Sequence, residues 1–340
     1  ATLTESQLRC AARVAKRELE KGNRDKRKQR RNGPEKTEGE GEQEMDIEEV
    51  IRLVKKFFPE VQIQRQEGGK IVGLVRMHTV TLVSSGAHQV VYVRPIPGET
   101  NEEGAMPDLI EALYEAYGKT DLFKMVTTDA GNNSLAAAEA IVSRRWEYCL
   151  QIKEDQRELL KEAKLQLGTR SVEKADFTCA DIHGNEVVTY VVFVHPLGEA
   201  GWLNWSHARV LVRVVRITQV KGGSEERRGE RYYVCSCALK PAQLLRIIRS
   251  HWRCENNTHW TNDVFLHEDV NHRHQWTNNP RGIVVMAILR ALALNILALL
   301  RYLSRLPYTY ETPSWRTAVS YTHLRAHETR HDLVCRLLLE

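Results

Sequence analysis

Two different periods of apolar and polar residues alternate along the first half of the chain. A helical period over residues 47–58 stops before Pro59, and the same period predicts helices over residues 106–117 and 134–145. Strand-like apolar runs fill four segments between and around these helices: 71–84, 89–95, 122–128 and 146–152. Strands that alternate with helices indicate an α/β layer architecture.

The pattern changes in the second half of the chain. Residues 171–237 contain several β-branched runs around glycine-rich turns, which we interpret as an all-β insertion, and helices resume at Pro241. The most apolar segment, residues 283–303, is interrupted by Arg290, and its longest charge-free run is too short to span a bilayer. A buried core helix is therefore expected there, with no membrane contact.

Composition permits several partners and favours a reduced environment. With 340 residues and 42% hydrophobic content, the chain can bury a substantial core. Lys and Arg exceed Asp and Glu by only 49 to 44, but between Arg246 and Arg305 eight arginines accompany four acidic residues. The seven cysteines have no repeated spacing and fit reduced thiols in a cytosolic protein. We interpret the Cys235-Ser-Cys237 pair as strand alternation rather than as a metal or redox site.

The first 46 residues are rich in charge and poor in large apolar side chains. A basic run from Lys21 to Arg31 is followed by an acidic run from Glu35 to Glu44. Such a segment buries too little apolar surface to offset the entropy of ordering, so a partly helical, flexible arm is expected. The basic run could touch DNA, but the adjacent acids favour a solvated linker.

One carboxylate on a predicted helix, Glu255, has neighbours that suit nucleic-acid chemistry. The side chains three or four residues away, on the same side of that helix, belong to His251, Trp252, Thr258 and His259. A carboxylate can hold a divalent cation, while aromatic and basic groups can stack on bases and hold phosphates. The alternative is a polar helix face that covers a core.

A second acid, Asp129, closes the apolar strand predicted over residues 122–128. Ligand and catalytic groups gather at the carboxyl ends of strands in α/β sheets. An acid before the Gly131-Asn132-Asn133 turn is also good turn chemistry, and it could cap the helix that begins near Ser134. Position alone leaves both interpretations open.

Two blocks of residues carry a resemblance to a known family. One block includes Val126-Thr-Thr-Asp129-Ala130 and Tyr148-Cys-Leu-Gln-Ile-Lys153-Glu-Asp-Gln156. The other reads Arg249-x-His251-Trp252-x-x-Glu255-Asn256-x-x-His259-Trp260-x-x-Asp263-Val264-x-x-x-Glu268-Asp269. Both resemble DDE transposases, and most closely the H-repeat-associated insertion-sequence transposases. The similarity covers residues 71–305, and the His-Trp-x-x-Glu-Asn block is specific.

The resemblance implies a fold and a metal site. The fold would be a ribonuclease H-like mixed sheet flanked by helices, with the all-β insertion before the helix that carries the last catalytic acid. Three carboxylates would hold two Mg²⁺ ions, with Mn²⁺ able to substitute; Asp129 would be the second acid and Glu255 the third. One ion activates a water or a DNA 3′-hydroxyl, and the other stabilises the leaving oxygen.

The resemblance also implies partners. Double-stranded DNA, at the transposon ends and at the target, would be bound in the bacterial cytoplasm at the nucleoid. The catalytic unit would be a homodimer in a synaptic complex, because synapsis joins two DNA ends. The residues expected to contact DNA or support Glu255 are Lys153, Gln156, Arg249, His251, Trp252, Asn256 and His259.

The chain departs from the family pattern at the first acid. The family carries it in an Asp-Gly-Lys element, whereas this chain has Gly68-Gly69-Lys70 at the nearest equivalent position. Glu67 and Asp46 are the substitutes within the chain, and Glu99 replaces the Lys of a further family element. Either the acid lies upstream of Ala1 and the chain is an N-terminally truncated fragment, which we favour, or the acid is lost and the protein is a relic.

The C-terminal tail contains a misleading pattern. His323, His327 and His331 lie four residues apart, as metal ligands on one helix face would. Residues 319–340, however, resemble the translation of a sequencing adapter, and we treat them as non-native.

The expected organisation has five parts and one leading function. The parts are a charged arm (1–46), the first part of the catalytic core (47–165), the β-rich insertion (166–240), the C-terminal helical part of the core (241–306) and a tail (307–340). The leading hypothesis is a transposase that cuts and rejoins DNA at insertion-sequence ends. A catalytically inactive remnant that only binds DNA and a stand-alone metal-dependent nuclease are the alternatives.

Overall fold

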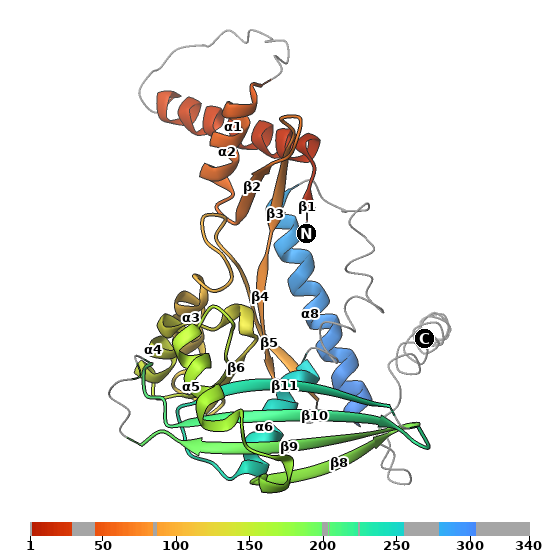
Figure 1. Ribbon diagram of the computed structural model, residues 1–340. Coiled ribbons are helices and arrows are strands. Elements are labelled where there is room, and N and C mark those ends of the chain that lie inside the picture. The colour runs from red at the N-terminus through yellow and green to blue at the C-terminus, as the bar shows by residue number, and fades with distance from the viewer. Residues whose placement is uncertain are drawn as a thin grey trace, which may run out of the picture. The chain divides into compact units, whose positions relative to one another are not determined.

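A computed structural model of the chain describes residues 2–28, 45–83, 87–198, 203, 205–223, 225–254 and 279–303 (Figure 1). The chain divides into two compact units, and each is described by itself. One is formed by residues 102–255, and the other by residues 1–101 together with 256–340.

The unit of residues 102–255 is built on a six-stranded mixed sheet with the order β6-β7-β11-β10-β9-β8. Its strands are β6 (Met125–Thr128), β7 (Glu147–Gln151), β8 (Phe177–His183), β9 (Glu186–Pro196), β10 (Val210–Val220) and β11 (Glu226–Cys235). Strands β6 and β7 pair in parallel, and the other neighbours pair antiparallel. The predicted α/β class is thus confirmed as a mixed sheet with helices.

Helices cover both faces of this sheet. They are α3 (Met106–Tyr117), α4 (Leu135–Ser143), α5 (Arg157–Leu167) and α6 (Pro241–Cys254), with the short 3-10 helices η1 (Ala130–Asn132) and η2 (Val172–Lys174). Val212 and Val214 of β10 share a buried cluster with Leu244 of α6. Arg213, between those valines, points the other way and donates to the carbonyl of Leu167 at the end of α5. Alternating side chains of β10 therefore face α6 and α5 in turn.

An ion pair between the buried Arg213 and the partly exposed Glu230 lies at the centre of the sheet. Arg213, only 4% exposed, donates from Nε and Nη2 to Glu230 Oε2 of β11 at 2.9 and 2.6 Å. Its Nη1 donates to the carbonyls of Leu167 and Arg170 at 2.8 and 3.2 Å. Partial burial acts to raise the pKa of Glu230, but hydrogen bonds from Tyr232 and Arg213 outweigh it, and that pKa lies below its ordinary value. The charges are thus paired and hydrogen-bonded, as burial requires.

Within its described residues, the other unit combines a small sheet, a hairpin and three helices. In chain order its elements are β1 (Thr2–Leu3), α1 (Glu5–Lys28), α2 (Ile47–Phe57), β2 (Val61–Arg65), β3 (Ile71–Val75), β4 (Met77–Leu82), β5 (Gln89–Pro95) and α8 (Pro280–Leu303). The sheet is antiparallel with the order β1-β3-β2, and β4 pairs with β5 as a separate hairpin. The single β segment expected over residues 71–84 is divided between β3 and β4.

The N-terminal region differs from the flexible arm expected over residues 1–46. Helix α1 buries one face, with Leu8, Ala11, Ala12 and Ala15 at most 2% exposed. The spacing of these residues is helical, but three of them are alanines, so the sequence appears poor in large apolar side chains. Residues 29–44, which hold the whole acidic run, lie outside the described residues.

Helix α8 is buried along one stripe only. Leu294 and Ala298 pack against Val90 of β5, and the Asn295 amide both donates to the Val90 carbonyl and accepts from its N–H, each at 2.7 Å. Several large apolar side chains of α8 are about half exposed, including Leu292 at 54%. The expected buried helix is therefore only partly buried. Helix α8 is long and apolar enough to cross a membrane, but core helices of soluble proteins meet the same criteria of length and composition.

The substitutes considered for the first acid do not lie on strands. Gly68 and Gly69 have φ angles of +86° and +79° in the turn that joins β2 to β3, and Glu67 belongs to the same turn. Asp46 is the N-cap of α2, where its carboxylate accepts from the Glu48 N–H at 3.2 Å. Among the described residues, the position that the resemblance assigns to the first acid is therefore occupied by a hairpin turn.

Candidate functional site

The carboxyl ends of β6 and β7 bring two predicted site residues to one edge of the sheet. The strands are parallel with Thr128 opposite Leu150, so Asp129 follows directly after β6 while Lys153 follows shortly after β7. The Asp129 side chain is 52% exposed. It makes no capping hydrogen bond to η1, and the cap of α4 comes instead from Ser134, whose Oγ accepts from Ala137 N–H at 3.1 Å. The cap interpretation of Asp129 is therefore wrong.

The Asp129 carboxylate instead contacts helix α6. His251 Nε2 lies 2.8 Å from Asp129 Oδ1, and His251 Nδ1 lies 3.1 Å from Thr127 Oγ1. The imidazole is only 17% exposed. Thr127 and Asp129 are two residues apart, and this spacing places both side chains on the face of β6 that α6 covers. The strand tip and the helix that leads toward Glu255 are thus joined through one histidine.

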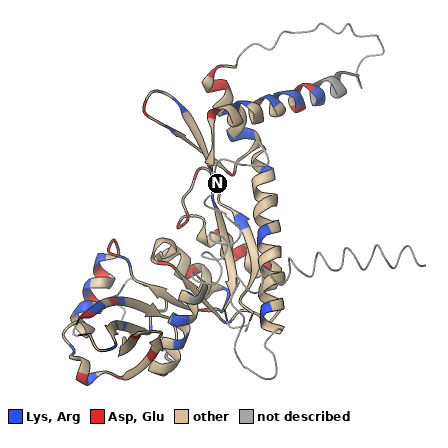
Figure 2. Ribbon diagram, turned by 90° about the vertical axis from the view of Figure 1, so that its right-hand side faces the viewer, with Lys and Arg blue, Asp and Glu red and all other residues tan. Residues whose placement is uncertain are grey.

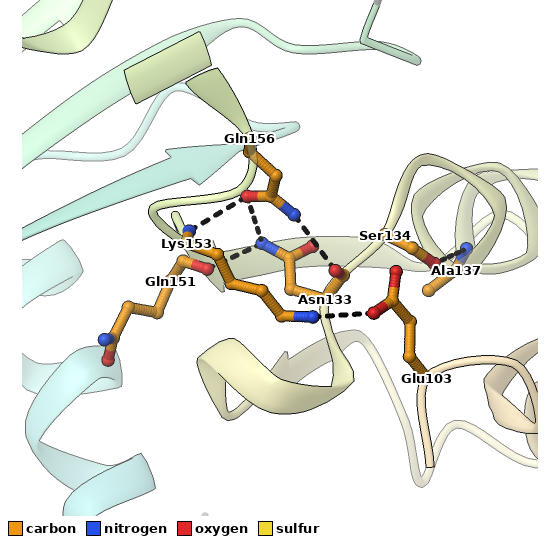
Figure 3. Close-up of polar contacts among 7 residues, drawn as sticks. All are labelled: Glu103, Asn133, Ser134, Ala137, Gln151, Lys153 and Gln156. Atoms are coloured by element: carbon orange, nitrogen blue, oxygen red, sulfur yellow. Dashed lines mark hydrogen bonds and ion pairs between the residues drawn. The ribbon is translucent and has the colours of Figure 1, made fainter. Parts of the chain in front are cut away.

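A polar network joins the turn after β6 to the turn after β7 (Figure 3). Gln156 Nε2 donates to the Asn133 carbonyl at 3.0 Å, and Gln156 Oε1 accepts from the Lys153 N–H at 3.0 Å. Asn133, fully buried, donates from Nδ2 to the Gln151 carbonyl at 2.6 Å and reaches Gln156 Oε1 at 3.5 Å. These bonds hold the two strand-end turns in one arrangement.

The Lys153 ammonium is paired within the chain. Its Nζ lies 2.7 Å from Glu103 Oε2, and the lysine side chain is 14% exposed (Figure 3). A phosphate that bound Lys153 would have to share it with Glu103.

Two further predicted DNA contacts lie on α6 and pack on the sheet. The Arg249 guanidinium is hydrogen-bonded to Asp181 of β8 and lies 4.7 Å from the centre of the Tyr190 ring. Trp252 lies 6.0 Å from the same ring, and the Arg231 guanidinium lies 5.4 Å above the Trp252 indole. In this structure both side chains help to hold α6 on the sheet.

The remaining predicted site residues are not described. Glu255, Asn256 and His259 follow Cys254, the last described residue of α6, and lie outside the described residues. Within the described ranges, no three His, Cys, Asp or Glu side chains are grouped so that they could hold a metal ion.

Basic and acidic residues both occur along the ribbon of the long strands of the same sheet (Figure 2). Arg216 of β10 and Arg227 and Arg228 of β11 are exposed. Arg227 is ion-paired with Glu186 at the start of β9. Glu226 and Glu230 of β11 are exposed as well, so this surface carries charges of both signs.

Three residues of the site were missed by sequence reasoning. Thr127, Asn133 and Glu103 contact the predicted residues His251, Gln156 and Lys153. For Thr127 a signal existed, since it shares a strand face with Asp129. Glu103 and Asn133 lie in turns, whose side-chain partners have no sequence period.

The fold and this edge of the sheet define an α/β protein with a carboxylate at a strand end and a helix packed beside it. The chain matches the family described as "Transposase DDE domain" over residues 45–296. That match covers most of the sequence, and the chain belongs to this family.

Two relatives from Escherichia coli (strain K12) are similar to part of the chain. One is named "H repeat-associated putative transposase YhhI" and the other "Putative protein YbfL". Each is 24% identical over 201 residues, which make up 57% of this chain and 52% of the relative. The chain thus spans about half the length of the curated relatives it matches, and the family predicted from the sequence is confirmed.

Proposed function

We propose that this chain carries the catalytic core of a DNA transposase that cuts and rejoins phosphodiesters at the ends of an insertion sequence. The observation that supports it best is the placement of Asp129. This acid follows β6 at the carboxyl edge of a parallel strand pair, and its side chain is directed to α6 through His251. Glu255 lies four residues after His251 in the sequence.

The chemistry of Asp129 suits a hard divalent cation. Carboxylate oxygens are preferred ligands of Mg²⁺, and the half-exposed side chain is accessible to solvent ions. In the proposal, Asp129 and Glu255 would hold Mg²⁺ or Mn²⁺ with a further acid that we do not assign. Two such ions, when bound, would supply an activated oxygen nucleophile and stabilise the leaving oxygen.

The protein residues supply position and charge in this proposal. The network of Gln156 and Asn133 keeps the two strand-end turns together. Little conformational entropy would therefore be lost when Asp129 binds a metal ion. Lys153 would exchange Glu103 for a DNA phosphate. Arg249 and Trp252 would hold α6, and Asn256 and His259 would contact DNA or support Glu255.

The proposal extends to fold detail and assembly. We propose a ribonuclease H-like core over residues 47–165 and 241–306, with residues 166–240 as a β-rich insertion. The antiparallel strands β8 to β11 between α5 and α6 support this division. A homodimer that acts on double-stranded DNA in the bacterial cytoplasm is part of the same proposal.

A DNA cleavage assay with matched carboxylate variants tests the proposal. The full chain is incubated with DNA that carries its element's ends and with Mg²⁺ or Mn²⁺. Asp129→Asn and Glu255→Gln should each abolish cleavage while DNA binding is largely retained. Asp121→Asn, which changes an exposed acid in the turn before β6, is the control and should cleave like the wild type.

The outcomes separate the candidate functions. Cleavage followed by joining of the ends to a target supports a transposase, whereas cleavage of any DNA without joining supports a stand-alone nuclease. DNA binding without cleavage under either metal supports an inactive remnant. Full cleavage by Asp129→Asn would remove that residue from the site.

A further inference from the structure

We propose that His251 is a positioning residue, which fixes the orientation of the Asp129 carboxylate rather than contacting DNA. The inference rests on the proposed function, because it assigns a role to His251 within that same site. It differs from the expectation of a DNA contact drawn from the sequence.

The hydrogen-bond directions are set by the chemistry of the three groups. A carboxylate can only accept, so His251 Nε2 must carry the proton that it shares with Asp129 Oδ1 over 2.8 Å. In the neutral ring Nδ1 is then an acceptor, and the Thr127 hydroxyl donates to it over 3.1 Å. The chain of donors runs from Thr127 through His251 to Asp129.

Both ring nitrogens are therefore engaged within the protein. The ring is also mostly buried, at 17% exposure, while the carboxylate it contacts is 52% exposed. A side chain with this placement has no further nitrogen to offer a phosphate or a base. It can hold one oxygen of Asp129 in a fixed direction and leave the carboxylate accessible.

The arrangement links two elements far apart in the sequence. Thr127 and Asp129 come from β6, while His251 is on α6, more than 120 residues later. The contact therefore holds the end of β6 against α6. Partners that orient ligating groups in this way typically contribute about 10- to 100-fold in metal affinity or activity.

The first test reads the imidazole directly in the metal-free full chain. Nitrogen-15 labelling of histidine and long-range nitrogen–proton spectra at pH 8 distinguish a proton on Nε2 from one on Nδ1. We expect His251 to carry its proton on Nε2, and Thr127→Val to weaken that preference. A proton on Nδ1, or a ring that exchanges freely between the two forms, would overturn the proposal whatever the activity of the chain.

The second test compares two substitutions of nearly equal size. His251→Gln keeps an N–H donor near the position of Nε2, whereas His251→Leu removes it. We expect Mn²⁺ affinity and Mg²⁺-dependent cleavage to fall about 10- to 100-fold in His251→Leu and to recover substantially in His251→Gln. Ser250→Ala is the control. It removes a hydroxyl that donates to the Arg246 carbonyl of the same helix.

The two proposals fail in distinguishable ways. If Asp129→Asn abolishes Mn²⁺ binding and cleavage but His251→Leu leaves both unchanged, the positioning role is wrong and the proposed function stands. If Asp129→Asn itself has no effect, the proposed function is wrong. Equal losses in His251→Leu and His251→Gln, with unchanged DNA affinity, would also exclude positioning through the N–H donor.

Discussion

Two polar clusters lie on the same six-stranded sheet, and they are built in opposite ways. Arg213 is on β10, inside the sheet, with a helix over each face, and its side chain is 5% exposed. Asp129 follows β6, the edge strand, and its side chain is 52% exposed. Arg213 donates four hydrogen bonds to three residues, whereas the Asp129 carboxylate is bonded to His251 of α6.

In the proposed function, the difference separates a group that holds the fold from a group placed for chemistry. A buried charge must be satisfied completely, because an unpaired one costs several kcal/mol. Next to Asp129 in the sequence, by contrast, buried side-chain oxygens of Thr128, Asn132 and Asn133 have no hydrogen-bond partner among the described residues. Such groups are rare in native cores, and a water molecule or an ion can supply the missing hydrogen bond.

The largest expected effect is on stability, at the central cluster. Arg213→Ala removes four hydrogen bonds, to the Glu230 carboxylate and to the carbonyls of Leu167 and Arg170, and it should lower the free energy of unfolding by about 3 kcal/mol. Urea unfolding followed by circular dichroism measures this loss. Arg216→Ala, an exposed arginine of the same strand, is the control and should change stability by less than about 0.5 kcal/mol. Equal losses of stability in Arg213→Ala and Arg216→Ala would show that the Arg213 cluster does not hold the fold.

A smaller loss is expected in the network that joins the strand-end turns. Asn133→Ala removes the donor to the partly buried Gln151 carbonyl and should cost about 1 to 2 kcal/mol. Because the turn before α4 is then less fixed, DNA cleavage should also decrease. The exposed Asn185, in the β8–β9 turn, provides the control as Asn185→Ala. Unchanged unfolding in Asn133→Ala would show that the network does not stabilise the strand ends.

The central cluster should also respond to acid. The folded pKa of Glu230 is lowered, so its contribution to stability is present above the ordinary value of 4.5 and is lost as the pH falls through the folded pKa. The contribution is below about 1 kcal/mol because the side chain is partly exposed. Glu230→Gln should reduce the loss of stability between pH 5 and pH 3 relative to wild type, in unfolding curves at constant ionic strength. The same pH dependence of stability in Glu230→Gln and in wild type would contradict the pairing of Glu230 with Arg213.

Substitution of Asp129 should have the smallest effect on stability, although it should have the largest effect on activity. Asp129→Asn keeps the shape of a half-exposed side chain and should change the free energy of unfolding by less than about 0.5 kcal/mol. Thermal unfolding of this variant beside Arg213→Ala provides the comparison. A loss as large as that of Arg213→Ala would mean that Asp129 is a structural residue.

Much of the sheet and helix order could be predicted because its signals are local. The segments expected over 106–117, 122–128, 134–145 and 146–152 correspond to α3, β6, α4 and β7 within a few residues. A partly helical arm was expected over residues 1–46, but the burial of α1 was not, because its buried face consists mainly of alanine. Helix α5 and strand β2 were missed, since both are rich in charged or polar residues.

The site was predictable only in part. The position of Asp129 at a strand end made it a candidate, and the resemblance to DDE transposases selected it over the capping alternative. Its contact with His251 depends on how β6 and α6 pack, across 122 residues of sequence, and no period in the chain reports it. The pairing of Lys153 with Glu103 was hidden for the same reason, since Glu103 lies in a turn 50 residues earlier.

The central claim is that Asp129 and Glu255 hold a shared divalent ion. Calorimetric titration of the metal-free chain with Mn²⁺, in wild type, Asp129→Asn, Glu255→Gln and the double variant, tests it directly. We expect each single substitution to abolish the same Mn²⁺-binding event, and the double variant to bind no less Mn²⁺ than either single variant. Binding that survives in either single variant, or losses that add in the double variant, would contradict it.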